Sequence, residues 1–152
     1  MDYEIIVMDA CPASDEEAIR IAAHALYEAG CVTEDFAQAC IDREKIYPTG
    51  IPSVVPIAIP HSEAENVLKK AVCILRLKEP VYFCSMENRE NELPVEYVFN
   101  LAVEAGKDQI KMLQAVVRMA RDHESLKLAK TMSQEEMREY FIKALTDEGD
   151  RS

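Results

Sequence analysis

Short apolar segments alternate along the chain with longer segments whose apolar residues repeat at helical spacing, and this alternation limits the possible folds. Strands are predicted where residues typical of β-structure cluster, at 3–8, 54–59, 71–77 and 93–104. Helices are predicted where the spacing is helical, at 14–30, 33–47, 108–122, 123–130 and 133–145. Strands mixed with helices before and after them predict an α/β fold: a single three-layer domain over residues 1–152, with a mixed β-sheet between helices.

Specific residues mark the ends of the first two predicted helices. Ser14 and Glu17 form the pattern of a capping box, and Gly30 follows the last helical residue as a C-cap. Thr33 is expected to cap the start of the second helix, and Pro48 is expected to enforce its end. These signals predict two helices joined by a short turn.

Later segments carry three narrower expectations. Pro56 cannot donate to a sheet ladder, so it suggests that the strand 54–59 lies at an edge or contains a bulge. Ser133 is expected to cap the last helix. One face of the helix 108–122 is expected to be buried because four apolar residues repeat along it: Ile110, Leu113, Val117 and Ala120.

The overall composition is that of a soluble globular protein. Of 152 residues, 49% are hydrophobic and 30% are charged, and no apolar run approaches the ~20 residues that cross a bilayer. The first residues lack the basic segment and long apolar core of a secretory signal, so a cytoplasmic protein is expected. The net charge of -11 argues against nucleic acids and anionic membranes as partners, because both are polyanions. The charge fits either a solvated acidic surface or attraction to a basic protein partner.

The five cysteines give no sign of a metal or redox site. No two of them have the C-x-x-C spacing of a zinc cage or a dithiol pair. All five are expected to be buried and reduced: Cys11, Cys31, Cys40, Cys73 and Cys84. The chain also has only 4 glycines and no glycine-rich phosphate loop, which argues against a nucleotide-using kinase.

Of the three histidines, His61 has the surroundings most typical of a reactive side chain. It follows a predicted strand end, where folds built from a sheet and helices commonly present functional groups. Pro60 has a fixed φ and restricts the residue before it, so the imidazole is presented along a defined path. His24 is expected to be a partly buried packing residue, and His123 is expected to lie at the carbonyl end of the long helix.

The segment "REKIYPTGIPSVVPIAIPHSE" combines an R-E pair, "YPTGI" and an apolar strand that ends in "IPH". It resembles the active-site segment of enzyme IIA proteins of the phosphoenolpyruvate-dependent sugar phosphotransferase system. The similarity is to the fructose/mannitol class, and within it to the galactitol-like branch. It extends over residues 5–145 and includes "VLKKAVCILRLKEPVYF" and "VFNLAVEAGKDQIKMLQAV".

The resemblance implies that His61 is both phosphoryl acceptor and phosphoryl donor. It would take the group from the phosphocarrier protein HPr and pass it to a cysteine of the cognate enzyme IIB, which works with the membrane enzyme IIC on galactitol or a related polyol or sugar. In this family the reacting atom is Nε2, so an acceptor such as a backbone carbonyl has to hold Nδ1–H. The phosphorus arrives as phosphohistidine, so the resemblance implies neither a metal nor an organic cofactor.

The same resemblance implies roles for two further residues. Arg43 matches the family's phosphate-facing arginine, whose forked guanidinium suits a phosphoryl group. The alternative is a helix-surface arginine paired with Asp42 or Glu44. Gln109 is expected near the place where mannitol-type proteins carry a second histidine, and its amide would be a neutral donor to phosphate.

Two other functions stay open. The chain could be a regulatory binding module that docks on regulators according to its phosphorylation state. It could also be a structural or interaction protein in which His61 is inert. Phosphoryl transfer to a cognate enzyme IIB would separate the carrier from the regulator, and a failure to be phosphorylated would support the structural protein.

Overall fold

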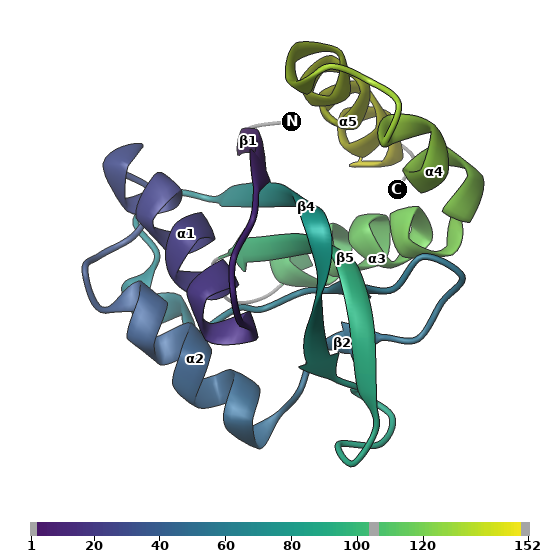
Figure 1. Ribbon diagram of the computed structural model, residues 1–152. Helices are drawn as coiled ribbons and strands as arrows, with labels where there is room; N and C mark the ends of the chain where they lie inside the picture. Colours follow the sequence, from purple (N-terminus) through teal and green to yellow (C-terminus); the bar gives the residue numbers. More distant parts are fainter. Residues whose placement is uncertain (1–2, 104–106, 150–152) are drawn as a thin grey trace.

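The computed structural model describes residues 3–103 and 107–149, and it describes their side chains except at 107–109 and 147–149. The chain forms an α/β fold with a mixed sheet between two helical layers, as the sequence predicts (Figure 1). The sheet order is β1-β4-β5-β3-β2. The bounds are Glu4–Ala10 (β1), Gly50–Ile51 (β2), Ile57–Ala58 (β3), Ala71–Cys84 (β4) and Glu92–Ala102 (β5).

The four predicted strands all lie in this sheet, but their lengths differ from the prediction. The strand expected at 54–59 is reduced to two residues, whereas the strand expected at 71–77 continues to Cys84, with an irregularity in its pairing between Arg76 and Val81. The two-residue strand β2 was not predicted, because so short a segment has no periodicity. β1 runs parallel to β4, and β3 parallel to β5, while β4–β5 and β2–β3 are antiparallel.

The described helices divide between the two faces of the sheet. Their bounds are Asp15–Glu28 (α1), Phe36–Ile46 (α2), Lys107–Arg121 (α3), His123–Ala129 (α4) and Gln134–Gly149 (α5), with a 3-10 turn at Ala64–Asn66 (η1). Helices α1 and α2 cover one face, and α3, α4 and α5 cover the other (Figure 1). No helix in the described part of the chain is both long enough and apolar enough to cross a bilayer.

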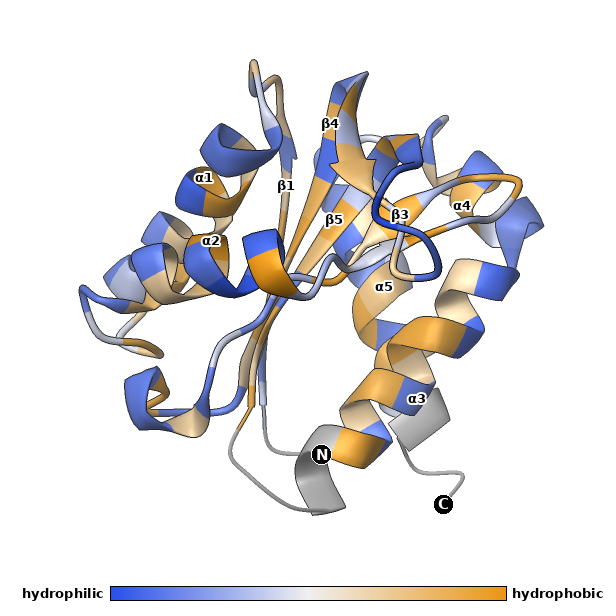
Figure 2. Cartoon of the chain, turned by 90° about the horizontal axis from the view of Figure 1, so that it is seen from below, coloured by the Kyte–Doolittle hydropathy of each residue, from blue (hydrophilic) through white to orange (hydrophobic). Residues whose placement is uncertain are grey.

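The strands of the sheet are rich in hydrophobic residues (Figure 2). Their side chains alternate between two cores, one on each face of the sheet. Val72 and Ile74 of β4 face the layer of α3–α5, while Cys73 and Leu75 face α1 and α2. On the α3–α5 side, the Phe141 ring of α5 lies 5.9 Å from the Phe99 ring and meets it edge-on at 86°. Two buried faces explain why these strands have continuous apolar runs.

Four of the predicted helix boundaries are confirmed. The Ser14 hydroxyl oxygen accepts a hydrogen bond from Glu17 N at 3.1 Å, and Gly30 follows α1 with a φ of 77°. A complete capping box opens α5, in which Ser133 N donates to Glu136 Oε1 and Glu136 N donates to Ser133 Oγ. The second helix ends at Ile46, just before Pro48.

Two expectations about boundaries and edges are wrong. Thr33 does not cap α2, which begins at Phe36; its hydroxyl instead donates to the side chain of Asn66 at 3.1 Å, where two distant segments pair. Of the edge or bulge that Pro56 suggested, the edge is wrong, because β3 lies between β5 and β2, and Pro56 itself lies just before β3. Its carbonyl accepts a hydrogen bond from Glu96 N of β5 at 2.9 Å, so the missing donor does not prevent a contact with the sheet.

The buried face of α3 also differs from the expected one. Ile110 is 58% exposed, and Leu113 and Val117 are only half-buried. Of the expected residues, only Ala120 is buried. The buried stripe of α3 consists of Met112, Ala115, Val116, Met119 and Ala120. This helix carries two adjacent apolar rows, and periodicity alone does not say which of them meets the sheet.

The cysteines follow the expectation only in part. Cys31, Cys40 and Cys73 are buried free thiols, as expected. Cys11 is exposed and Cys84 is half-buried, so the expectation of burial is wrong for both. Cys11 directly follows the end of β1, and Cys84 is the last residue of β4, where one side of the chain faces solvent.

Gly50 lies in β2 where the chain passes close to the end of β4. Its carbonyl accepts a hydrogen bond from Met86 N at 2.7 Å, and it pairs with Ser85. A Cβ added at Gly50 would lie 2.6 Å from the carbonyl oxygen of Cys84, which is closer than the contact distance of these atoms. Glycine is therefore required here by the close approach of two backbone segments.

We expect Gly50→Ala to lower the free energy of unfolding by ~1–3 kcal/mol, because β2 and the end of β4 have to move apart. Urea denaturation followed by circular dichroism measures this loss. Gly30→Ala is a comparison with a different cause: no atom lies within 4 Å of the added Cβ, but φ is +77°, so a cost of about 1 kcal/mol from backbone conformation is expected. An unfolding midpoint of Gly50→Ala equal to that of the wild type would contradict the close approach.

Candidate functional site

His61 lies three residues after the end of β3, in a segment that the neighbouring strand β5 holds in place. It forms an isolated parallel bridge with Leu101 of β5. The carbonyl of Pro60 accepts two hydrogen bonds, one from Leu101 N at 2.9 Å and one from the side-chain amide of Asn100 at 2.9 Å. The backbone that carries the imidazole is thus fixed by main-chain and side-chain donors.

The His61 ring is oriented by its own backbone. Nδ1 lies 2.9 Å from the carbonyl oxygen of Ile59, and a carbonyl can only accept, so Nδ1 carries the hydrogen and Nε2 keeps its lone pair. Burial lowers the pKa of His61 below its usual value, and the nearby Arg43 charge adds to this, against the opposing effects of the Ile59 bond and Glu63. The ring is therefore neutral at neutral pH, with Nε2 as its nucleophilic atom.

Arg43, in the last turn of α2, is brought next to His61 by the fold. Its Nη1 donates to the carboxylate of Glu63 at 2.8 Å, and its guanidinium carbon lies 5.1 Å from the centroid of the Tyr47 ring. Its Nε is buried and has no hydrogen-bond partner among the described residues. Arg43 thus forms its ion pair with Glu63 beside His61, rather than with Asp42 or Glu44.

Glu44 and Thr49 form a buried link to the same site that sequence reasoning missed. The Glu44 carboxylate accepts hydrogen bonds from Thr49 N at 2.7 Å and from the Thr49 hydroxyl at 2.8 Å. The Thr49 hydroxyl oxygen in turn accepts a hydrogen bond from Ile59 N at 3.1 Å. Burial raises the pKa of Glu44 to about 7, although the two bonds from Thr49 lower it. Glu44 stands in the "RE" and Thr49 in the "PTG" of the segment that carries the family resemblance, and these motifs were the sequence signal that could have identified them.

Asn100 is a second residue that the sequence analysis did not single out. It is fully buried in β5, and its side-chain nitrogen also lies 3.6 Å from the sulfur of Cys40. Its Oδ1 has no hydrogen-bond partner among the described residues. An amide in the middle of an apolar strand could have indicated a buried polar contact, because such groups are costly to bury without a partner.

The structure describes no contact of His61 with Gln109 or with the other two histidines. Gln109 is the third residue of α3, and its side chain lies outside the described part of the structure. His24 is exposed, with 70% of its side chain accessible, and lies 3.4 Å from Glu28, so the expectation of a partly buried packing residue is wrong. His123 does not end the long helix but begins α4 after Asp122. Among the described residues, no group of three or more histidine, cysteine or acidic side chains could hold a metal ion.

The raised pKa of Glu44 predicts a dependence of stability on pH. Between about pH 4.5 and pH 7 the folded chain keeps a proton on Glu44 that the unfolded chain has released, so stability falls as the pH rises. Relative to Glu44→Gln, the wild type should lose up to roughly 3 kcal/mol of unfolding free energy across this window. Urea denaturation of both proteins at several pH values measures the difference. A difference that does not vary with pH would show that Glu44 titrates normally.

Comparison with known proteins places this geometry in a family. Residues 1–144 match the model of the phosphoenolpyruvate-dependent sugar phosphotransferase system, EIIA 2. The chain is 32% identical over 119 residues to the galactitol-specific EIIA component of Escherichia coli (strain K12), covering 78% of this chain and 79% of that protein.

Two solved structures are similar over nearly the whole chain. The crystal structure of IIA mannitol from Escherichia coli has a TM-score of 0.71 at 28% identity, over 93% of this chain and 95% of that one. The complex of enzyme IIA and phosphorylated enzyme IIB for mannitol, also from Escherichia coli, has a TM-score of 0.62 at 25% identity, over 95% of this chain and 94% of that one. With these matches in sequence and fold, the chain belongs to the EIIA 2 family of the phosphoenolpyruvate-dependent sugar phosphotransferase system.

Proposed function

We propose that this chain is a phosphoryl carrier in which Nε2 of His61 accepts a phosphoryl group and then donates it. The observation that carries this proposal is the 2.9 Å contact of Nδ1 with the Ile59 carbonyl, which leaves the Nε2 lone pair free on a neutral ring. Membership of the EIIA 2 family supplies the reaction class.

The proposed reaction consists of two displacements at phosphorus. The Nε2 lone pair attacks the phosphorus of a phosphohistidine on HPr, so that a new N–P bond forms as the donor's N–P bond breaks. A cysteine thiolate of the cognate enzyme IIB then attacks the same phosphorus, so that an S–P bond forms and the lone pair returns to Nε2. No electron transfer is involved, and no metal or organic cofactor is required.

Arg43 is the proposed group for stabilising phosphate charge. Its guanidinium lies close enough to affect the pKa of His61, and its buried Nε has no partner among the described residues. The bond from Nη1 to the exposed Glu63 is an exchangeable contact, because exposed ion pairs contribute little. A phosphoryl group on His61 would offer Arg43 more charge and more acceptor oxygens than Glu63 does.

Gln109 is proposed as a neutral hydrogen-bond donor to the same phosphate. Its place in the first turn of α3 is described, and its role rests on the family resemblance alone. A neutral amide there would leave Arg43 as the principal cation at the phosphate.

The proposed partners are HPr, a cognate enzyme IIB and, through IIB, the membrane enzyme IIC. The structure of the Escherichia coli mannitol proteins contains IIA bound to phosphorylated IIB, and the net charge of -11 favours basic partner surfaces. The galactitol-specific relative supports galactitol or a related polyol or sugar as the transported compound. A carrier that exchanges phosphoryl groups with HPr would work in the cytoplasm.

We expect incubation with phosphoenolpyruvate, enzyme I and HPr to add one phosphoryl group that is acid-labile and base-stable, because the N–P bond of phosphohistidine has these properties. His61→Ala should abolish it. Intact-mass spectrometry measures the product. His24→Ala and His123→Ala are the controls and should be labelled like the wild type. A His61→Ala chain that still carries the group would refute the assignment.

Arg43→Ala should slow phosphoryl transfer from His61 to enzyme IIB by ~10²-fold or more, because a charged donor to phosphate is lost. Arg43→Lys should recover only part of the rate, since a point charge lacks the bidentate fork. Rapid-quench measurement of the phosphorylated chain gives both rates. Circular dichroism should show that all three proteins are folded, and an unchanged rate in Arg43→Ala would return this residue to a structural role.

A further inference from the structure

Glu44 is a buried acid that lies apart from the proposed reaction but is connected to it by hydrogen bonds. It is 8% exposed, and Thr49, to which it is bonded, is 4% exposed. Both carboxylate oxygens are used: Oε2 accepts from Thr49 N and Oε1 accepts from the Thr49 hydroxyl. A buried carboxylate with two short bonds to a single residue restricts the position of that residue.

Thr49 is bonded in turn to Ile59, the residue whose carbonyl orients the imidazole. Its single hydroxyl hydrogen is donated to Glu44, so its oxygen is left to accept the hydrogen bond from Ile59 N at 3.1 Å. Ile59 then holds Nδ1–H of His61 through its own carbonyl at 2.9 Å. Four groups therefore form one chain of bonds, from a carboxylate on α2 to the reactive ring.

We propose that Glu44 is a positioning residue, which acts through Thr49 and Ile59 to keep His61 in the tautomer that leaves Nε2 free. This inference rests on the proposed function of His61, and it adds a residue that touches neither the ring nor the phosphoryl group. Downstream of Ile59, the bonds from β5 to the Pro60 carbonyl hold the other end of the segment. The Ile59 carbonyl is thus held between two anchors, and Glu44 supplies the upstream one.

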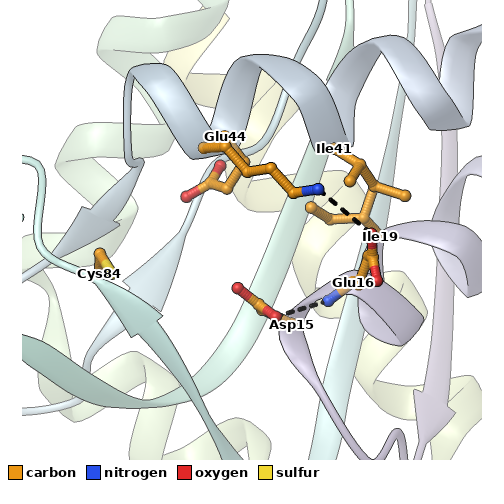
Figure 3. Close-up of a pocket in the computed structure, with 7 residues that line it drawn as sticks. Asp15, Glu16, Ile19, Ile41, Glu44 and Cys84 are labelled. Carbon is orange, nitrogen blue, oxygen red and sulfur yellow. Dashed lines mark hydrogen bonds and ion pairs between the residues drawn. The ribbon is translucent and has the colours of Figure 1, made fainter.

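Glu44 is reached by a cavity beside the start of α1, and His61 is not among the residues that line this cavity. Glu44 lines a cavity of about 170 Å³ with Ile19, Ile41 and several polar residues. Figure 3 shows Asp15 and Glu16 at the start of α1 across this cavity from Glu44, with Cys84 at the end of β4. The rim residues Glu16 and Lys45 are exposed, so a proton can reach Glu44 while His61 is covered by a partner protein.

The charges around Glu44 make its ionisation responsive near neutral pH. The titratable and charged groups that face it come from α1, α2 and β4: Asp15, Glu16, Arg43, Lys45 and Cys84. Burial is the main cause that raises the pKa of Glu44 to about 7, Asp15 adds to the rise, and Thr49 and Arg43 oppose it. When protonated, Glu44 would donate to the Thr49 oxygen, and the hydroxyl hydrogen would need another acceptor. The support of Ile59 would then weaken.

The test uses the unphosphorylated full chain labelled with ¹⁵N-histidine, at pH 8, where Glu44 is ionised and His61 is neutral. In the wild type we expect the ¹⁵N spectrum of His61 to show a protonated Nδ1 and an unprotonated Nε2. In Thr49→Val, which keeps the shape but loses the hydroxyl, the Nε2–H form should become measurable, and phosphorylation by phospho-HPr should slow ~10-fold or more. Glu44→Gln should shift both readouts in the same direction, because an amide has only one oxygen for two donors.

Two matched variants separate positioning from general damage. Thr49→Ser keeps the hydroxyl and should retain the wild-type tautomer and most of the rate. Glu16→Gln lines the same cavity without bonding Thr49 and should change neither. The proposal is overturned if folded Thr49→Val keeps the wild-type tautomer and rate, or if Thr49→Ser behaves like Thr49→Val.

A pH series on the wild type provides a second measurement that needs no variant to fold. The ¹³C signal of the Glu44 carboxyl and the ¹⁵N signal of His61 Nδ1 should share an inflection near pH 7, above the inflection from protonation of the ring itself. Independent titrations would overturn the link. The tautomer readout requires no phosphoryl transfer, so a tautomer change in a chain that phospho-HPr never labels would refute the proposed function and keep the link.

Discussion

The antiparallel pairing of β4 with β5 is the interaction on which the rest of the molecule depends. These two long strands lie at the centre of the sheet, and their side chains alternate between the two cores. A slip of one residue in their register would exchange the two faces and direct Asn100 away from α2. Because both faces are covered by helices, the apolar runs of β4 and β5 leave little freedom in how the layers assemble.

The site follows from this central pair, since β5 also carries the residues that hold the His61 segment. Leu101 N and the Asn100 amide meet on the Pro60 carbonyl, while α2 approaches the same segment through Glu44 and Thr49. Buried polar groups of this kind stabilise one arrangement because each alternative would leave a donor or acceptor unpaired. The His61 ring is therefore positioned by contacts to strand β5 and helix α2.

The electrostatics of the site are divided between its two sides. On the solvent side, the half-buried Arg43 and the exposed Glu63 form an ion pair beside His61, and the Arg43 charge helps to keep the ring neutral. On the buried side, Glu44 faces Asp15, and burial gives it an affinity for protons that an exposed carboxylate lacks. Arg43 and Glu44 thus act on the segment that carries His61 from opposite sides, Arg43 by its charge and Glu44 by hydrogen bonds.

Local signals in the sequence were reliable where the responsible atoms are close along the chain. Neighbours within a few residues decide four of these features: the caps at Ser14 and Ser133, the end of α2 before Pro48 and the strand end before His61. Arg43 was assigned from the resemblance of a whole segment, and the spacing of residues could not have separated it from a surface arginine. The predictions for Thr33 and His24 were wrong because each depends on neighbours that the local sequence does not reveal. Thr33 bonds to the distant Asn66, and among the described residues no other element covers the side chain of His24, which is exposed.

By itself, the sequence determined the α/β class, the order of the long strands and helices, and the identity of His61 as the candidate nucleophile. Apolar periodicity and proline restrict the backbone locally, whatever the remainder of the chain does. Only the tertiary structure decided which row of α3 is buried, that Glu63 pairs with Arg43, and that Thr49 and Asn100 support the segment carrying His61. Those contacts join residues 10 to 40 positions apart, and such contacts form only when the fold brings separate elements together.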